Sequence, residues 1–307
     1  MVETLALLVA ASMNAGTVLA LASMGLLINE RAGVLNLGAE GMMLIGAVLG
    51  FAVDVHTGSD VLAFVAAAAG GAALAAVFGA LVVGLDSNQY ATGLVISLFG
   101  AGLSTFIGIP YTKERLTERP HYEVAGLSHV PFFGNAFFKH HPLVYAVIAL
   151  AIATGWFFQK SRPGLVVRAV GDSPHSAQAL GLPVGAVRLA AVVAGGALAG
   201  IAGAYVSVAY TPLWVEGMVA GRGWIALALT TFAAWRPGRV LLGAYLFGGV
   251  TMIQLRLQAG GIQLPSQLLA MLPYLSTIVV LAAISRNSTR MRVSMPASLG
   301  KPFHPRA

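Results

Sequence analysis

The chain has 307 residues, of which 57% are hydrophobic and only 9% charged, and its formal net charge is +7. A soluble domain carries about 25% charged residues, so too few charges remain here to cover a soluble globule. The apolar majority excludes intrinsic disorder, and no persistent heptad pattern indicates a coiled coil. Together with a mean hydropathy of +0.81, these numbers predict a membrane protein that crosses the bilayer several times.

The sequence contains no cysteine, which excludes disulfides, thiol nucleophiles and cysteine-ligated metals. We attribute its 18 lysines and arginines to cytoplasmic loops rather than to nucleic-acid binding, so no nucleic-acid partner is expected. Residues 1–4 supply no basic region ahead of the first apolar run. That run is therefore expected to be a first span and not a cleaved signal peptide.

Apolar runs predict an all-α fold with nine transmembrane or partial segments, of which 223–235 is short for a full crossing. Placing the polar stretch 159–186 in the cytoplasm and alternating outward puts 12 of the 18 basic residues inside, as the positive-inside rule favours. The N-terminus and the loop 110–141 are then outside, and the tail 286–307 is inside. The segments span approximately residues 4–27, 37–53, 61–85, 91–109, 142–158, 187–210, 223–235, 238–257 and 264–284.

The segments also suggest an inverted repeat. Residues 1–109 and 187–285 each hold four segments, and the single segment 142–158 between them inverts the second group. In each group a glycine-broken polar stretch follows the first long segment, at 29–38 and at 212–223. Interrupted segments in corresponding positions of inverted repeats are typical of a transport path.

The first break contains the most specific motif. Residues 28–46 read INERAGVLNLGAEGMMLIG. Glu30 and Arg31 fit either a solvated cytoplasmic loop or a membrane position, where charges face a partner or a water-filled cavity. Glu40 lies inside the next apolar run, so a solvated loop does not explain it.

This string resembles the hallmark of inner-membrane permease subunits of ABC importers, and it is most similar to the branch that imports nucleosides and simple sugars. The resemblance covers about residues 10–285. It implies one non-catalytic permease domain over 1–307 in the bacterial inner membrane, with nucleosides the first expected solute and simple sugars the next. It also implies three partners: a second, homologous permease, separate ABC ATPase subunits, and a substrate-binding protein or lipoprotein. No cofactor is expected.

The stretch 159–186 predicts a short helix over 174–180. Ser173 suits the N-cap, Pro174 the first helical position and Gly181 the left-handed site after the helix. A two-turn helix is unstable alone, so it lies on its own protein or on lipid, or it serves as the coupling helix that the resemblance implies, seated in an ATPase subunit. The residues expected to act in coupling are Arg168, Gly171, Asp172, Ser173, Pro174, His175, Ala177 and Gly181.

Polar residues in or beside apolar segments are candidates for the substrate path. Asn88, Gln89 and Thr92 suit a hydroxylated solute, although helix capping and interhelical bonding explain each of them more simply. Arg222 fits the path and a lipid headgroup equally well, and Trp235 is expected to anchor at the lipid interface. The complete candidate set is Asn36, Glu40, Asn88, Gln89, Thr92, Arg222 and Gln254.

Several chemistries have no motif here. The sequence contains no phosphate-binding loop, no His-Glu-x-x-His and no Gly-x-Ser-x-Gly, so ATP hydrolysis is expected on a partner subunit. Adjacent His140 and His141 diverge, and no metal site is expected. An ion-gradient-driven secondary transporter remains the alternative, but it favours acidic residues at mid-span, where Glu40 is the main exception. A channel would require a polar ring from a symmetric oligomer.

Overall fold

The computed structural model describes residues 2–117, 122–123, 132–260, 268, 271–272, 275–276, 278–279 and 295–304. Nearly all regular structure within them is helical, which confirms the predicted all-α class. The α-helices are α1 Val2–Arg31, α2 Ala39–Thr57, α3 Asp60–Gly79, α4 Gln89–Gly108, α5 Phe133–Phe137, α6 Pro142–Lys160, α7 Arg162–Asp172, α8 Pro174–Ala179, α9 Val184–Ala204, α10 Arg222–Phe232 and α11 Pro237–Ala259. Shorter elements are the π-helical turns η1 Ala80–Gly84 and η3 Tyr205–Tyr210, the 3₁₀ turn η2 Ile109–Tyr111, and the antiparallel strands β1 Tyr122–Glu123 and β2 Lys139–His140.

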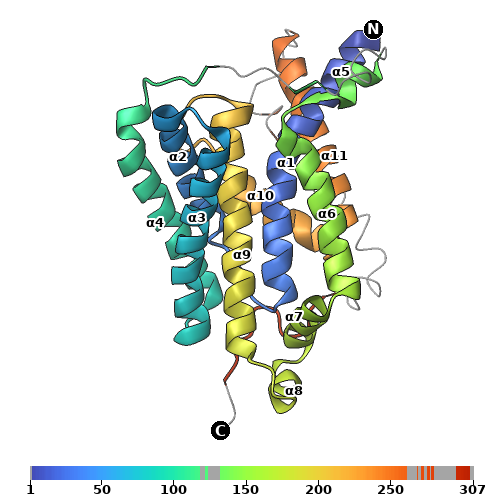
Figure 1. Ribbon diagram of the computed structural model, residues 1–307. Helices are drawn as coiled ribbons and strands as arrows, with labels where there is room; N and C mark the ends of the chain where they lie inside the picture. The colour runs from blue at the N-terminus through green and yellow to red at the C-terminus, as the bar shows by residue number, and fades with distance from the viewer. Residues whose placement is uncertain are drawn as a thin grey trace.

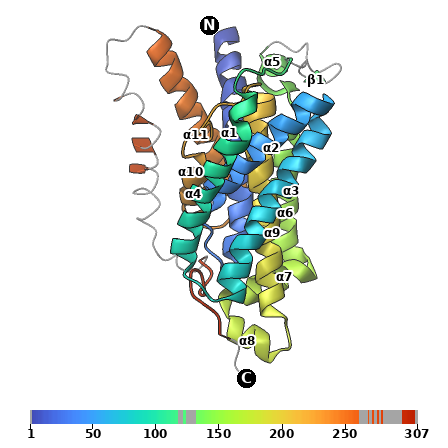
Figure 2. The same ribbon diagram turned by 90° about the vertical axis from the view of Figure 1, so that its left-hand side faces the viewer.

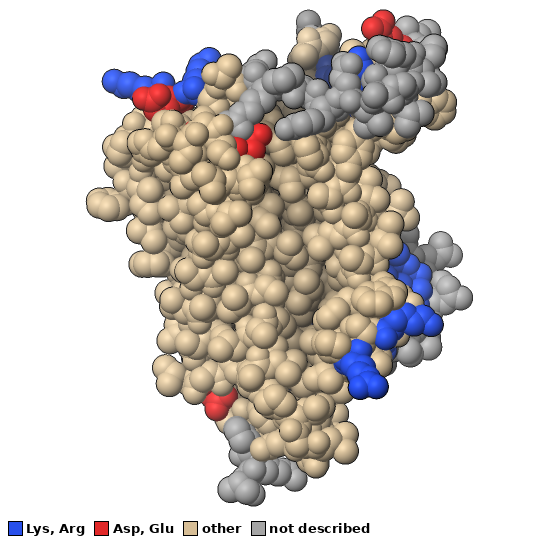
Figure 3. Space-filling view, in the orientation of Figure 1, with Lys and Arg blue, Asp and Glu red and all other residues tan. Residues whose placement is uncertain are grey.

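Seven helices in the described part are long and apolar enough to cross a membrane. They match the predicted segments except 223–235 and 264–284, and most of the latter lies outside the described residues. On the face shown in Figure 3, charged side chains lie along the top, on the right-hand edge from about mid-height downward and near the bottom, and the broad centre is uncharged. The polytopic architecture is therefore confirmed. The seven are Glu3–Arg31, Ala39–Thr57, Asp60–Gly84, Gln89–Tyr111, Pro142–Lys160, Val184–Tyr210 and Pro237–Ala259.

Helices α1 and α9 lie side by side at the centre of the bundle. Helices α2, α3 and α4 cover one side of this pair, and α6 and α11 cover the other (Figure 1). Both views place α7 and α8 at the end opposite the N-terminus (Figure 1, Figure 2). The short helix α10 packs against α1, and most of 223–235 is buried or half-buried, with Trp224 exposed.

The predicted short segment is the second part of a longer passage. Residues 211–235 start beside the loop 110–141, where Leu116 N–H donates to Pro212 O at 3.1 Å. They end at Trp235, whose carbonyl oxygen accepts a hydrogen bond from Arg31 at the C-terminal end of α1. With 11 residues, α10 is only about 16 Å long, so the irregular stretch 211–221 and α10 together make up this passage.

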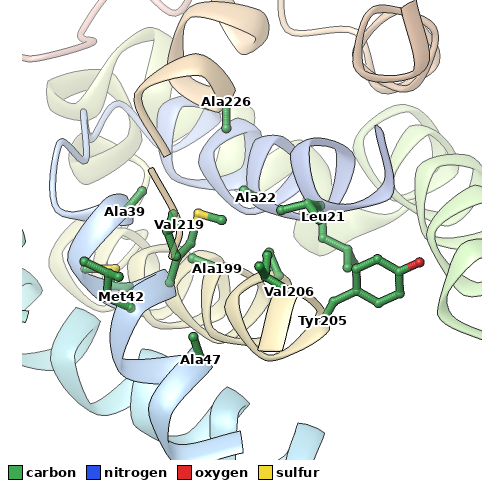
Figure 4. Packing of buried hydrophobic residues seen from close by; sticks show 14 of the residues in the cluster. Leu21, Ala22, Ala39, Met42, Ala47, Ala199, Tyr205, Val206, Val219 and Ala226 are labelled. Atoms are coloured by element: carbon green, nitrogen blue, oxygen red, sulfur yellow. The ribbon is translucent and has the colours of Figure 1, made fainter. Parts of the chain in front are cut away.

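Small residues allow the central helices to approach closely. A side chain on Gly46 of α2 would run into the backbone of Gly200 on α9, and one on Gly71 of α3 would meet Gly196. Around these contacts, residues from α1, α2, α9, η3 and α10 interdigitate, with alanines beside larger side chains (Figure 4). Since lipid offers apolar helices no hydrophobic gain on association, this close packing is a main source of cohesion.

Gly46→Val is expected to destabilise the protein, because the added side chain collides with backbone that cannot move aside. Overpacking of this kind costs about 1–3 kcal/mol or more. Gly102→Val is the matched control, since a Cβ added at that helical glycine would meet no neighbouring atom within 4 Å. Thermal unfolding in detergent measures both variants. Equal melting temperatures for the two would contradict the glycine contact.

Candidate translocation and coupling site

The first break joins α1 to α2 through residues 32–38. Gly33 lies in the left-handed region (φ +86°), and its N–H donates to Glu30 O at 2.9 Å. This geometry is the common way for a helix to end at glycine. Asn36 Oδ1 then accepts the Gly38 N–H at 2.9 Å, directly before α2 begins. The break predicted from the sequence is thus present.

The second break, residues 211–221, leads from η3 to α10. Gly217 and Gly221 both adopt positive φ, at +67° and +81°. Trp214 is buried within the break, and its ring occupies the space that a side chain at Gly108 of α4 would fill. The chain is therefore held in an irregular path between packed helices, which is where broken backbone is tolerated in a membrane.

Glu40 in the first turn of α2 joins the two breaks. Its Oε1 accepts the Gly221 N–H and its Oε2 accepts the Gly223 N–H, each at 2.7 Å. The N-terminal N–H groups of a helix have no partner inside the helix, and a carboxylate also suits the positive end of the helix dipole. Gly223 makes room for this contact, because a side chain there would lie 2.7 Å from Glu40 N.

The other end of α10 is tied to the end of α1. Trp235 Nε1 donates to the carboxyl group of Glu30, and Arg31 Nη2 donates to Trp235 O at 2.8 Å. In the last turn of α10, Thr230 Oγ1 donates to Ser23 O at 3.3 Å. Because Trp235 is only 2% exposed, the expectation that it anchors at the lipid interface is wrong. Glu30 is fully buried, which rules out the solvated-loop interpretation for its side chain.

The start of α4 supports the first break. Gln89 is buried, and its Oε1 accepts the Leu35 N–H at 2.8 Å. Asn88 Oδ1 accepts two backbone N–H groups in the first turn of α4 and so caps the helix. The hydroxyl oxygens of Thr92 and Ser87 lie 3.0 Å apart. Asn88 therefore caps α4, Gln89 bonds the backbone of the first break, and Thr92 has a local hydroxyl partner.

The two remaining path candidates lie on different helices. Arg222 begins α10, and its Nη1 donates to Met218 O at 2.9 Å. Gln254 is half-buried in the C-terminal half of α11. The structure thus gathers four of the seven predicted path residues at the breaks, two at the start of α4 and one on α11: respectively Asn36, Glu40, Gln89 and Arg222; Asn88 and Thr92; and Gln254.

The stretch 159–186 forms two helices joined by a tight elbow. The predicted short helix is confirmed as α8, with Ser173 accepting the Ser176 N–H and Gly181 at φ +80°. Helix α7 was not expected in this polar stretch. Ser161 caps it by accepting the Gly164 N–H at 3.0 Å, so the same capping rule that identified α8 would have identified α7.

The predicted coupling residues divide by exposure. One group faces inward: Gly171, for example, packs so closely on the first break that a side chain there would run into Arg31 O. Leu180, which follows α8, is 80% exposed and was not among the predicted residues. Gly171, Pro174 and Ala177 are buried, Arg168 and Ser173 are half-buried, and Asp172, His175 and Gly181 are exposed.

The family model of the branched-chain amino acid transport system permease component matches residues 8–284. The chain belongs to this family. The permease is 43% identical to a putative glucose ABC transporter permease, TsgC13, of Haloferax volcanii, with 94% of each chain covered. It is 32% identical to the nucleoside ABC transporter permease NupC of Lactococcus lactis, with 92% of this chain and 93% of the relative covered.

A third relative is the guanosine ABC transporter permease NupQ of Bacillus subtilis, at 28% identity over 98% of both chains. No solved structure matches the permease. The resemblance stated from residues 28–46 is thereby confirmed: the chain is an ABC transporter permease of the nucleoside and sugar type.

Glu40→Ala is expected to destabilise the permease by about 1–3 kcal/mol for each backbone N–H that loses its partner. Glu40→Gln keeps one acceptor and is expected to lose less. Glu114→Ala, which removes an exposed glutamate from the loop 110–141, is the control. Thermal unfolding in detergent ranks the three variants. A Glu40→Ala protein that melts with the control would show that the carboxylate does not hold α10.

Proposed function

We propose that this permease subunit serves an ATP-driven, binding-protein-dependent importer and that its two breaks border the solute path. The supporting observation is a direct connection between them: Glu40, in the first turn of α2 directly after the first break, caps α10 after the second. The interrupted segments fall in corresponding positions of the suspected repeats 1–109 and 187–285, within one transmembrane domain, and transport paths are commonly built this way.

We place the permease in the inner membrane with its N-terminus outside. The positive-inside rule assigns the α7–α8 end to the cytoplasm. Figure 1 has this end opposite the N-terminus, and residues 295–304 lie at the same end because Ser298 bonds to Gly171. This arrangement agrees with an outside N-terminus and an inside C-terminal tail.

A second permease completes the path in this proposal. Haloferax volcanii has a further relative, the glucose permease TsgB13, at 28% identity over 60% of this chain, beside TsgC13. Bacillus subtilis likewise has the guanosine permease NupP, at 26% identity over 72% of this chain, beside NupQ. Two permeases with the same named solute in one organism support a heterodimeric pair, with ATPases and a solute-binding protein or lipoprotein completing the importer.

The elbow between α7 and α8 transmits the ATPase motion. Exposed residues at α8, such as His175 and Leu180, meet the ATPase, while buried Gly171 rests on the first break. From there the hydrogen bonds of Arg31 and Glu40 lead to both ends of α10. ATP binding favours the inward-open or the outward-open state of the path only if the ATPase binds the two states with different affinity. We propose that the ATPase makes this distinction through its contact with the elbow.

Glu40 argues against an ion-gradient mechanism. A secondary transporter favours ionisable residues at mid-span as its proton or sodium site. Here both oxygens of Glu40 accept backbone N–H groups at 2.7 Å, so the carboxylate serves the fold. ATP hydrolysis on a partner subunit supplies the energy instead.

The proposed solute is a nucleoside, because the relatives NupC and NupQ cover nearly the whole chain. A hexose is the second candidate, and the 43% identity to the putative glucose permease favours it. We expect the reconstituted importer to take up labelled guanosine, with unlabelled nucleosides competing and glucose not competing. If glucose competes and nucleosides do not, the solute is a hexose. Uptake without ATP or without the ATPase would contradict the proposal of an ATP-driven importer.

Leu180→Glu is expected to weaken ATPase binding at least tenfold, because a charge replaces an exposed apolar contact at the proposed interface. Its fold should persist, since the side chain is 80% exposed. Lys113→Glu, an exposed charge change at the opposite end of the bundle, is the control. Co-purification of the ATPase from co-expressed complexes measures the effect. Equal recovery of the ATPase with both variants would show that Leu180, beside α8, does not contact the ATPase.

A further inference from the structure

Residues 295–304 lie across the elbow between α7 and α8. Ser298 is 6% exposed, and both its N–H and its hydroxyl donate to Gly171 O, at 3.0 and 2.6 Å. The hydroxyl also accepts from Arg188 Nη2 at 3.0 Å. Arg188 stands in the first turns of α9 and is 3% exposed. Ser298 therefore anchors the segment to buried groups, although half of its residues, among them Met295, are exposed.

The same ten residues also contact the first break and the start of α4. Gly300 N–H donates to Gly33 O at 3.3 Å. A side chain at position 33 would collide with Ser298 Oγ, so a glycine is required there. Lys301 O accepts weak bonds, each at 3.5 Å, from Gln89 and Arg188. Gln89 is the residue that binds the backbone of the break at Leu35.

Phe303 closes the contact on the α8 side. Its ring lies 5.3 Å from that of His175, between centroids, and 5.7 Å from the guanidinium carbon of Arg188. It packs against the small apolar cluster of Val170, Ala177 and Val184. The segment therefore contacts the elbow, α9, the break and α4 within ten residues.

We propose that residues 295–304 form a clasp that makes the elbow and the first break move as one body, with Ser298 and Arg188 as positioning residues for transport. This inference rests on the proposed function. The clasp adds a second connection to the direct contact of Gly171 with Arg31. Because its bonds include backbone donors and buried side chains, the clasp stays closed through the cycle and carries force from α8 to the break.

The test uses the complete importer in proteoliposomes, with labelled guanosine, or labelled glucose where that is the solute, and measures solute taken up per ATP hydrolysed. Ser298→Ala removes the hydroxyl bonds to Gly171 and Arg188. We expect the ratio to fall at least fivefold, since each of the two hydrogen bonds contributes about one kilocalorie per mole net, while ATPase assembly persists. Phe303→Ala, at the half-buried edge of the clasp, is expected to lower the ratio as well.

Lys301→Ala is the matched control, because its side chain is exposed and only its backbone carbonyl is bonded. The clasp is overturned if Ser298→Ala and Phe303→Ala both keep the control's ratio. It is also overturned if both variants lose assembly, since the segment then only stabilises the fold. If Ser298→Ala alone fails to assemble, the ratio of Phe303→Ala decides. Failure of the wild type to bind an ATPase contradicts the proposed function instead, so the two failures are distinguishable.

Discussion

A broken helix inside a membrane must satisfy its backbone polar groups from within the protein, because lipid offers them no partner. Glu40 meets this constraint for α10 by accepting two of its N-terminal N–H groups. Asn36 and Gln89 do the same for the first break, through Gly38 and Leu35. The unusual polar content of an otherwise apolar motif is explained by this requirement, and the positions of α2, α4 and α10 follow from it.

The hydrogen bonds that pair the backbone N–H groups of the breaks also connect the two breaks. Helix α10 is bonded to α2 at its start through Glu40 and to α1 after its end through Trp235. A displacement at the end of α1 therefore reaches α10 without a flexible joint between them. In the proposed importer this connection turns a small movement at the elbow into a change in the wall of the path, which suits a subunit that contributes motion and no chemistry.

Local signals explain what the sequence predicted well. The order Ser173, Pro174 and Gly181 defines α8 through rules that act within one turn, and Glu40 was conspicuous because a charge interrupted an apolar run. The roles of Glu30 and Trp235 depend on each other across some two hundred positions, and neither residue alone indicates a partner. Helix α7 was overlooked because its polar face resembles a loop, although Ser161 carried the capping signal. The path and coupling assignments of individual residues stay predictions.

Solute selection requires side chains whose hydrogen-bonding groups are not already used within the protein. Glu40 and Gln89 have their principal hydrogen-bonding groups occupied by backbone, and Asn36 Oδ1 is occupied as well. If these residues border the path as we propose, we expect them to hold its backbone in place and not to select the solute. The comparisons agree, since relatives named for glucose and for nucleosides both match over more than nine-tenths of this chain. In the proposed importer, we therefore expect specificity to depend on half-buried side chains such as Gln254 on α11 and on the facing surface of the proposed second permease.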